Sequence, residues 1–275
     1  MAAIAHVLRF ENVVVEFDEV RALDNVSCEI REGETCVVLG AAGSGKTVFL
    51  KTALGLVRPQ SGSVWVFDRE ITRLAERDLI DIRGRVGVLF QEGGLFDSLN
   101  VEENVAYPLV NQYHRGAPPP EEVHSRVAEA LRFVELQHTL EKFPSELSGG
   151  MRRRVGIARA TVADPELLLY DSPTAGLDPI TANLIIGLLL KERSVRAITS
   201  VIVTQRFQDG QLLANFRYNP QSGAIERNPG NGAGVQHLTC FMVLQEGRLV
   251  FQGSEDELRD RTDPYVRKFV RPLRP

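Results

Sequence analysis

The sequence predicts an α/β fold built around one glycine-rich loop. Runs of β-branched and apolar residues at 35–39, 167–171 and 199–204 are typical of buried strands. The first run leads directly into the loop, and an apolar helical pattern follows the loop from residue 48. With 275 residues, 43% of them apolar, the chain can bury on the order of three quarters of its unfolded surface. One α/β domain with an appended subdomain fits this length.

The loop has the composition of a phosphate-binding P-loop. Residues 40–47 read Gly-Ala-Ala-Gly-Ser-Gly-Lys-Thr, and the glycines let backbone N–H groups turn inward around phosphate oxygens. Lys46 supplies charge for the β- and γ-phosphates, the Thr47 hydroxyl can bind Mg²⁺, and the following helix directs its positive end at the same anion. A flexible glycine turn or a dinucleotide fingerprint would leave Lys46 and Thr47 unexplained. The candidate nucleotide contacts here are Gly40, Ala41, Ala42, Gly43, Ser44, Gly45, Lys46, Thr47 and Val48.

A β-layer ahead of the loop suggests an edge that faces the nucleotide. The segment 7–17 alternates enough to predict a strand, and 23–30 is typical of its antiparallel return. Phe17, at the end of the first strand, is a candidate to stack on an adenine ring, although an aromatic residue in a strand more often lies in the core. Further elements predicted before residue 91 are a strand at 63–67, a helix at 75–82 and a strand at 86–90.

A helical subdomain is predicted to interrupt the α/β core. Residues 91–94, Gln-Glu-Gly-Gly, break the preceding strand, and the chain from 101 to 160 carries mainly helical signals. We therefore predict a single domain over 1–275 in four parts. These are a β-subdomain and α/β core at 1–90 and 161–253, a helical signalling subdomain at 91–160, a surface insertion at 215–239 and a C-terminal helical tail at 254–275. The other predicted elements are helices at 104–110, 121–136 and 152–163, a hairpin at 216–227, a loop at 228–234, and strands at 241–244 and 249–251.

Two further motifs extend the candidate site. Four hydrophobic residues precede Asp171, and a carboxylate at such a strand end can hold Mg²⁺ directly or through water. A lone buried aspartate is usually structural, but its position after a P-loop favours the metal role. Residues 147–151, Leu-Ser-Gly-Gly-Met, would by themselves indicate no more than a helix N-cap. Their position shortly before Asp171 makes them a stronger signal.

Taken together, these motifs make the chain similar to the ATP-binding subunits of ABC transporters over nearly its whole length. The resemblance assigns the Q-loop to Gln91, the signature to 147–151, Walker B to 167–171 and the D-loop to 175–178. It implies a P-loop NTPase fold with a RecA-like core, an antiparallel β-subdomain and an inserted helical subdomain. Gln91, which alone would be a polar loop residue, would link the γ-phosphate and Mg²⁺ to a transmembrane permease docked near the helical subdomain.

The resemblance also implies how the nucleotide is held. Two subunits would form a head-to-tail dimer, a homodimer in the simplest case, with ATP between the P-loop of one and the signature of the other. A hydroxyl, two amides without side chains and a helix N-terminus form a second anion cradle there. Phe17 matches the adenine-stacking aromatic. The implied signature contacts are Ser148, Gly149 and Gly150, and the implied metal ligands are Thr47, Gln91 and Asp171.

Two positions depart from the family pattern. Most members have a glutamate directly after the Walker B aspartate, where this chain has Ser172, and a histidine after the last core strand, where it has Gln205. A serine hydroxyl is no base near neutral pH, and loss of a general base costs about 10²- to 10⁴-fold in rate. A neutral side chain can still orient water. The candidate catalytic residues are therefore Gln91, Asp171, Ser172 and Gln205, and ATPase activity is expected to be weak.

Within the family, the chain most resembles the Mla or mammalian-cell-entry (MCE) type ATPases, which move phospholipids through a permease and a periplasmic lipid-binding component. The residues that carry this likeness are 90–109, the Met151 variant of the signature with Arg152, Arg153 and Arg154, the segment 178–181 and the tail 263–269. The resemblance implies an ATPase bound peripherally to the cytoplasmic face of the inner membrane. It implies phospholipid cargo and indirect contact with the MCE component.

Composition limits the alternatives. A net charge of −4 gives no basic field for nucleic acid, and we expect no nucleic-acid partner. The sequence shows no stretch of eighteen apolar residues and no leader, so we expect neither a membrane span nor secretion by a signal peptide. Cys28, Cys36 and Cys240 are expected to be packed thiols of a reducing cytosol. Two other functions stay open: a hydrolysis-impaired regulatory subunit gated by ATP, and a soluble ABC protein that acts on ribosomes or DNA.

Overall fold

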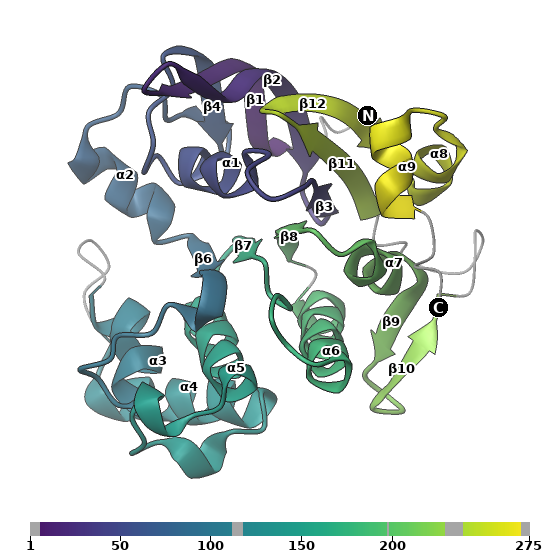
Figure 1. Ribbon diagram of the computed structural model, residues 1–275. Coiled ribbons are helices and arrows are strands. Elements are labelled where there is room, and N and C mark those ends of the chain that lie inside the picture. The colour runs from purple at the N-terminus through teal and green to yellow at the C-terminus, as the bar shows by residue number, and fades with distance from the viewer. Residues whose placement is uncertain (1–5, 112–117, 197, 229–238, 271–275) are drawn as a thin grey trace, which may run out of the picture. The chain divides into compact units, whose positions relative to one another are not determined.

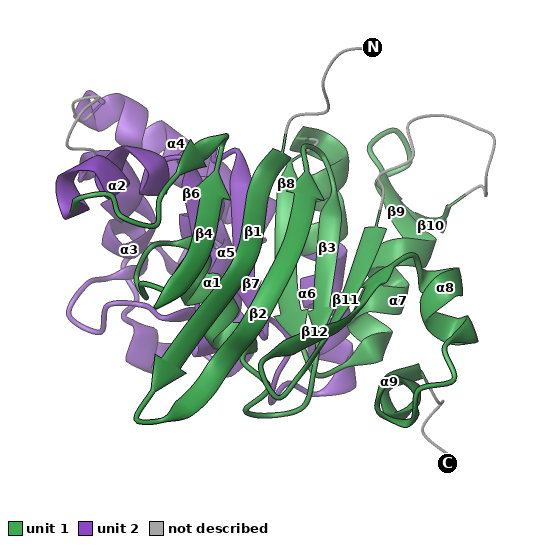
Figure 2. Ribbon diagram, turned by 90° about the horizontal axis from the view of Figure 1, so that it is seen from above, with its two compact units in different colours: residues 1–75, 189–275 green, residues 76–188 purple. Residues whose placement is uncertain are grey.

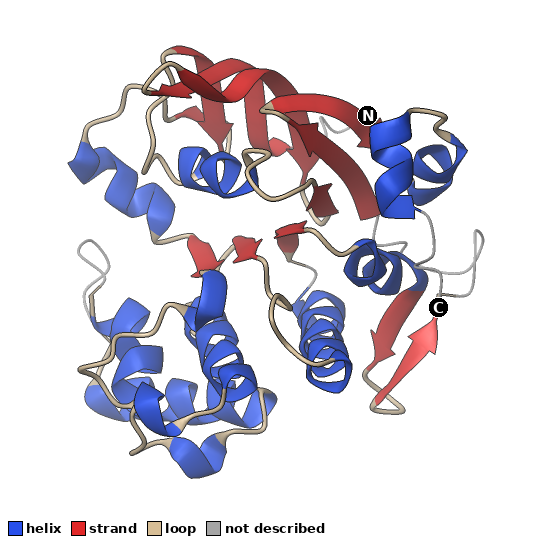
Figure 3. Cartoon of the chain, in the orientation of Figure 1, coloured by secondary structure: helices blue, strands red, loops and turns tan. Residues whose placement is uncertain are grey.

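The computed structural model describes residues 6–111, 118–196, 198–228 and 239–270 (Figure 1). The chain divides into two compact units, one formed by 1–75 with 189–275 and the other by 76–188 (Figure 2). The P-loop belongs to the first unit, and Gln91, the signature and Asp171 belong to the second. The predicted α/β class is confirmed, because both units contain strands as well as helices, as the chain coloured by secondary structure shows (Figure 3).

The first unit contains a sheet whose central strand leads into the P-loop. Strand β3 (Thr35–Leu39) pairs in parallel with β8 (Thr199–Thr204) on one side and with β11 (Thr239–Gln245) on the other. Strand β12 (Arg248–Gly253) adds an antiparallel edge next to β11. Every residue of β3 and β8 is buried, as expected for parallel strands covered on both faces.

A second, antiparallel sheet lies in the same unit, in the order β2-β1-β4-β5. The predicted return strand is confirmed, since β1 (His6–Phe17) pairs with β2 (Val20–Arg31) down to the pair Phe17 and Val20. Strands β4 (Ser61–Val66) and β5 (Arg69–Glu70) complete the sheet. Phe10 of β1 stacks on Phe49 of α1 (Lys46–Ala53) at a ring-centroid distance of 4.5 Å. This contact fixes the helix that follows the P-loop against the antiparallel sheet.

Helices in the remainder of the first unit position the C-terminal part of the chain. Helix α7 (Phe207–Asn215) lies against β3 and β11 through Gly210, where a Cβ would come within 2.6 Å of the Phe241 ring. Helices α8 (Glu255–Asp260) and α9 (Pro264–Val270) form the predicted helical tail segments. Helix α6 (Pro179–Arg196), whose residues 179–188 belong to the second unit, and helix α7 were not predicted.

The predicted hairpin is observed as β9 (Phe216–Asn219) and β10 (Ala224–Arg227), which pair antiparallel. Buried Arg193 of α6 fixes the start of this hairpin, because it donates to the carbonyl oxygens of Leu213 and Phe216, both at 2.8 Å. Burial lowers the pKa of Arg193 to about 10. Most of the loop predicted at 228–234 lies outside the described residues.

The second unit combines a parallel strand pair with a group of helices. Strands β6 (Val86–Leu89) and β7 (Leu167–Asp171) pair in parallel from Val86 and Leu167 to Leu89 and Tyr170. Gly87 of β6 allows α5 to approach, because a Cβ there would meet the Ala160 carbonyl oxygen at 2.0 Å. The helices are α2 (Glu76–Arg83), α3 (Val101–Val110), α4 (Pro120–Phe133) and α5 (Gly149–Thr161), with short 3₁₀ turns at Gln91–Gly93, Gln137–Thr139 and Pro144–Glu146.

Two expectations about composition are tested within the described residues. None of their helices combines the length and apolarity that a membrane crossing needs. Cys28, Cys36 and Cys240 are unpaired and buried, so the predicted packed thiols are confirmed. Burial raises the pKa of the Cys28 thiol, which makes it a poor nucleophile.

Candidate functional site

The P-loop backbone needs glycine at three positions. Gly43 and Gly45 have φ angles of 76° and 101°, in the left-handed region that other residues avoid. At Gly45, a Cβ would also lie 2.3 Å from the carbonyl oxygen of Ala22 on β2. At Gly40, a Cβ would lie 2.2 Å from Ser44 Oγ and 2.6 Å from the Leu244 carbonyl oxygen. The loop therefore follows a path that side chains at these positions would block.

Lys46 lies beneath the rim of this loop. Its side chain is buried, and Nζ donates to the carbonyl oxygens of Gly40 at 2.9 Å and Ala41 at 2.7 Å and to Ser44 Oγ at 3.3 Å. The rim residues Ala41 to Gly43 are exposed. A buried ammonium next to exposed loop residues is suited to bind an anion that arrives from solvent.

The first turn of α1 adds to the positive field of the loop. The N-cap is Gly45, which offers no side-chain acceptor to the N–H groups of the first turn. Such N–H groups bind phosphate or carboxylate where a cap is absent. Thr47, in the first turn, is exposed. The residues present therefore fit a nucleoside triphosphate: a cradle that a Cβ would fill, a cation beneath it and an uncapped helix start.

Phe17 lies at the tip of the β1–β2 hairpin rather than in the core. Its side chain is 48% exposed, and its pairing partner Val20 is 68% exposed. The same hairpin contacts the P-loop further along β2, where the Ala22 carbonyl oxygen faces Gly45. Phe17 is therefore an exposed aromatic ring on a hairpin that touches the P-loop.

The signature residues of the second unit begin α5. Ser148 is the N-cap, and its Oγ accepts from the Met151 N–H at 3.2 Å. Ser148 is exposed and Gly149 half-buried, while a Cβ at Gly150 would meet Thr181 Cγ2 at 2.6 Å. The motif therefore starts α5 with a serine N-cap, and Gly150 lets α6 approach the helix start.

Asp171 and Ser172 lie at the carboxyl end of β7. The Asp171 side chain is buried, and the Ser172 hydroxyl donates to Asp171 Oδ1 at 3.0 Å. Ser172 has a φ of 50°, in the left-handed region that is uncommon for a residue with a side chain. The position that carries a glutamate in most members of the resembled family therefore holds a hydroxyl bound to the neighbouring carboxylate.

Gln91 and Gln205 are both exposed. Gln91 begins the 3₁₀ turn Gln91–Gly93, whose Gly93 carbonyl oxygen accepts from Arg159 of α5 at 3.1 Å. Gln205 follows β8 in the first unit. The structure thus brings the P-loop and Phe17 together in one unit, and Asp171 and Ser172 together in the other.

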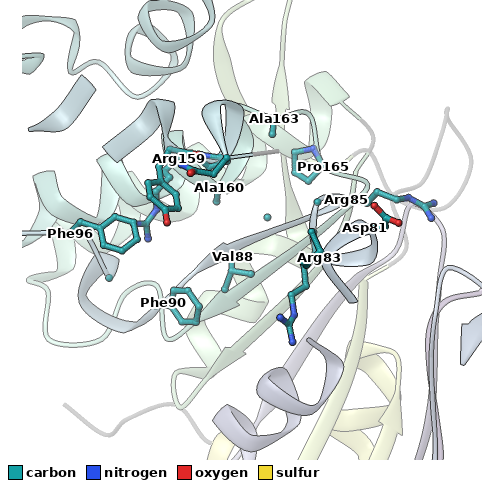
Figure 4. A pocket seen from close by; sticks show the side chains of 18 residues that line it. Asp81, Arg83, Arg85, Val88, Phe90, Phe96, Arg159, Ala160, Ala163 and Pro165 are labelled. Atoms are coloured by element: carbon teal, nitrogen blue, oxygen red, sulfur yellow. Dashed lines mark hydrogen bonds between the residues drawn. The ribbon is translucent and has the colours of Figure 1, made fainter. Parts of the chain in front are cut away.

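A cavity of about 560 Å³ adjoins the Gln91 turn within the second unit (Figure 4). Phe90, Phe96 and Tyr107 line it and are each at least 40% exposed, and the Phe96 and Tyr107 ring centroids are 4.6 Å apart. Arg159 lies over Phe96 at 5.7 Å, and burial lowers the pKa of its guanidinium. We call this cavity the apolar groove. The sequence did not reveal it, because its lining comes from α2, β6, α3 and α5.

The fold and these motifs define the class of a P-loop nucleotide-binding protein with a second candidate anion site at a helix N-terminus. Comparison with known families agrees, since the family described as ABC transporter matches residues 23–175. The chain belongs to this family.

Individual relatives extend the match along the chain. The methionine import ATP-binding protein MetN of Carboxydothermus hydrogenoformans is 45% identical over 190 residues, 69% of this chain and 55% of MetN. The probable ribonucleotide transport ATP-binding protein mkl of Mycobacterium tuberculosis is 40% identical over 254 residues, 92% of this chain and 63% of mkl. The protein TRIGALACTOSYLDIACYLGLYCEROL 3, chloroplastic, of Arabidopsis thaliana is 35% identical over 267 residues, 94% of this chain and 72% of that protein. The chain thus spans between 55% and 72% of the length of these relatives.

A solved structure gives the same fold. The ATP-binding cassette MJ0796, in a dimeric post-hydrolysis state bound to ADP and Pi, matches with a TM-score of 0.74 and 30% identity. The match covers 90% of this chain and 98% of that one. The P-loop ABC cassette fold predicted from the sequence is confirmed.

Proposed function

We propose that this chain is the ATP-binding subunit of an ABC transporter, that it binds ATP with Mg²⁺ and that it couples nucleotide turnover to a separate permease. The observation that carries the proposal is the P-loop, in which buried Lys46 lies beneath an exposed rim and the helix start has no side-chain cap. Lys46 would hold the β- and γ-phosphates, and Thr47, Gln91 and Asp171 would hold the metal. Bound ATP–Mg²⁺ would supply the phosphoanhydride bond whose cleavage drives the cycle.

Two copies are proposed to enclose the nucleotide. The P-loop and the exposed Ser148 with its two glycines are the two candidate anion cradles, and they belong to different units of the chain. In a head-to-tail pair, the P-loop of each copy would face Ser148, Gly149 and Gly150 of the other. The dimeric MJ0796 cassette supports this arrangement as a relative with the same fold.

Hydrolysis is proposed to be slow. The Ser172 hydroxyl is bonded to Asp171 at 3.0 Å, and neither Ser172 nor exposed Gln205 is a base near neutral pH. The absence of a general base is expected to cost about 10²- to 10⁴-fold in rate. This geometry also supports a second candidate function, a regulatory subunit that closes on ATP and hardly hydrolyses it.

The apolar groove is proposed as the permease docking site. Its exposed aromatic residues offer apolar area to a partner helix. Arg159 lines the groove and also donates to Gly93 in the turn that Gln91 begins. A helix seated in the groove would therefore act through Arg159 on the backbone of the Gln91 turn.

The proposed cargo is a phospholipid, delivered to or received from an MCE-type periplasmic component. The support is the resemblance over 90–109, 151–154, 178–181 and 263–269, together with a relative whose name contains a galactolipid. Other relatives are named for methionine import and ribonucleotide transport, and these cargoes are the alternatives. The proposed location is the cytoplasmic face of the inner membrane.

The first experiment is steady-state ATP turnover and ATP binding by the purified chain, with Lys46→Ala beside it. We expect native ATP binding and weak turnover, and Lys46→Ala is expected to lose at least about 100-fold in ATP affinity because it removes the buried cation. Lys51→Ala, on the same helix, is the control and should behave as the native chain. ATP binding without any turnover would favour the regulatory subunit, and absence of ATP binding would reject both.

The second experiment captures a tagged chain from membranes and identifies its partner and cargo by mass spectrometry. We expect one multi-spanning permease with bound phospholipid, and Phe96→Asp should reduce its capture at least about tenfold by placing a charge in the groove. Ile225→Asp on the hairpin, which is similarly exposed, is the matched control. Bound methionine or ribonucleotide would replace the lipid proposal, and recovery of ribosomes or DNA instead would contradict the transporter.

A further inference from the structure

The C-terminal helix reaches the first peptide of the P-loop. Tyr265 of α9 accepts a hydrogen bond at its hydroxyl from the Ala41 N–H at 3.0 Å. The same hydroxyl donates to the carbonyl oxygen of Leu244 at the end of β11, also at 3.0 Å. One side chain therefore satisfies a donor of the P-loop and an acceptor of the neighbouring strand.

The Tyr265 ring is fixed by its own helix. Asp263 Oδ1 accepts from the N–H groups of Tyr265 at 2.9 Å and Val266 at 3.0 Å, which caps the start of α9. Val266 is buried, and the Phe269 ring packs edge-on against Tyr265 at a centroid distance of 5.3 Å. The hydroxyl is thus presented to the loop by a side chain that has little freedom to move.

Tyr265 and Lys46 both form a hydrogen bond with the peptide group between Gly40 and Ala41. The Ala41 N–H and the Gly40 carbonyl belong to one planar unit, and the Gly40 oxygen accepts from Lys46 Nζ at 2.9 Å. Gly40 packs against the Leu244 carbonyl, where a Cβ would come within 2.6 Å. Tyr265 therefore holds one edge of the peptide and Lys46 the other, so the orientation of this peptide sets the position of the ammonium.

We propose that Tyr265 is a positioning residue of the P-loop, which orients the Gly40–Ala41 peptide and through it Lys46. The inference rests on the proposed function, since it assumes that ATP binds at this loop. The Ala41 N–H donates to Tyr265, so it orders the loop rather than binding a phosphate. The C-terminal tail thereby tunes nucleotide affinity, and any event that moves α9 changes it.

The test compares Tyr265→Phe with the native chain and with two variants of the same helix. Tyr265→Phe keeps the ring contact with Phe269 and removes only the hydroxyl. Loss of the two hydrogen bonds is expected to weaken ATP binding about three- to tenfold, with kcat at saturating ATP unchanged. Arg267→Gln, an exposed change, should bind ATP as the native chain does. Val266→Ala changes a buried residue of the same helix, and its ATP affinity shows how much binding is lost when α9 packs less tightly but the Tyr265 hydroxyl is kept.

Hydrogen exchange of the nucleotide-free chain separates positioning from simple packing. In Tyr265→Phe, the P-loop peptide that contains Ala41 should exchange faster while residues 264–270 keep their native exchange, and the midpoint of thermal unfolding should fall by less than about 3 °C. Native ATP affinity in Tyr265→Phe overturns the inference, as does faster exchange confined to α9. If the native chain itself binds no ATP, the proposed function fails first, and the exchange of Ala41 still reports whether Tyr265 orders the loop.

Discussion

The carboxyl ends of β3 and β7 carry two parts of the candidate site, and they are built differently. After β3, the loop path is imposed by Gly40, Gly43 and Gly45, and Lys46 is held by three acceptors. After β7, the Ser172 hydroxyl donates to Asp171, and the Ser172 carbonyl oxygen accepts from the Ala175 N–H. The geometry of the P-loop therefore depends on the backbone of many residues, whereas the proposed weakness of hydrolysis depends mainly on the side chain at position 172. The second property is the easier one to lose or restore.

The largest expected effect tests the single-side-chain part of this comparison. Ser172→Glu places a carboxylate next to Asp171, where it can polarise water, and should raise ATP turnover on the order of 10²-fold or more. ATP affinity should stay within about threefold of native, because the P-loop is unchanged. The measurement is steady-state turnover beside equilibrium ATP binding.

Ser172→Ala is the control for that experiment. It removes the hydroxyl without adding a base, and turnover should not rise above the native level. Fast turnover in the native chain with no gain in Ser172→Glu would show that Gln205 or another group already positions the water. The residues after β7 would then support hydrolysis as fully as the residues after β3 support nucleotide binding.

A smaller effect is expected from breaking the backbone part of the comparison. Gly45→Ala forces a φ of 101° on a residue with a Cβ and drives that Cβ to 2.3 Å from the Ala22 carbonyl. The free energy of unfolding should fall by about 3 kcal/mol, and ATP binding should be lost with the loop geometry. The measurement is denaturant unfolding without nucleotide, followed by ATP titration.

Gly43→Ala provides the matched comparison. Its φ is 76°, but a Cβ there meets no atom within 4 Å, so only the backbone term of about 1 kcal/mol remains. Equal destabilisation by the two alanines would mean that the contact with Ala22 relaxes freely. The hairpin that carries Phe17 would then not support the loop.

How far the sequence predicted this molecule depends on how local each feature is. Strands β7 and β8 were predicted to the residue because each is a short run, buried at every position, that is dominated by apolar and β-branched side chains. The P-loop was predicted because its residues are consecutive. Helices α6 and α7 were missed, since α6 has buried residues around much of its circumference and α7 is short. The boundaries of the other helices and strands differ from the predicted ones by a few residues, because the ends of elements are the least well defined by sequence patterns.

Features made by distant residues were out of reach of the sequence. The apolar groove combines Phe96 and Tyr107 with Arg159, and only packing of α3 on α5 brings them together. Tyr265 is 224 residues from Ala41, and no spacing rule joins a tail tyrosine to a P-loop amide. The role of Phe17 could not be decided from the sequence for a different reason. A phenylalanine in a strand can be a core residue or an exposed ring that stacks on a nucleotide, and only the fold shows whether its side chain is exposed.

The smallest expected effect concerns the support behind the P-loop. Asp24 accepts from Arg248 at 2.7 Å and from Arg21 at 2.9 Å, and these bonds hold the pKa of its carboxyl below the ordinary value of 3.8. Its N–H donates to the Gly247 carbonyl, and the Gly247 N–H donates to the carbonyl of Ser44 in the loop. A carboxyl with a lowered folded pKa stabilises the fold above its unfolded pKa, and the stabilisation is lost as pH falls through the folded pKa.

This sign gives a measurable pH dependence. The thermal midpoint of the native chain should exceed that of Asp24→Asn at pH 7, and the gap should close as pH falls below about 4. Asp18→Asn, an exposed carboxylate in the β1–β2 turn, should show no such closing gap. ATP affinity at pH 7 is the second readout. If Asp24→Asn lowers this affinity and Asp18→Asn does not, then the loss of the Asp24 ion pairs reaches Ser44 of the P-loop through the turn at Gly247. A difference in thermal midpoint that stays constant with pH would mean that Asp24 acts through its shape rather than its charge. The order of the P-loop would then depend on its glycines and Lys46 and not on this ion pair.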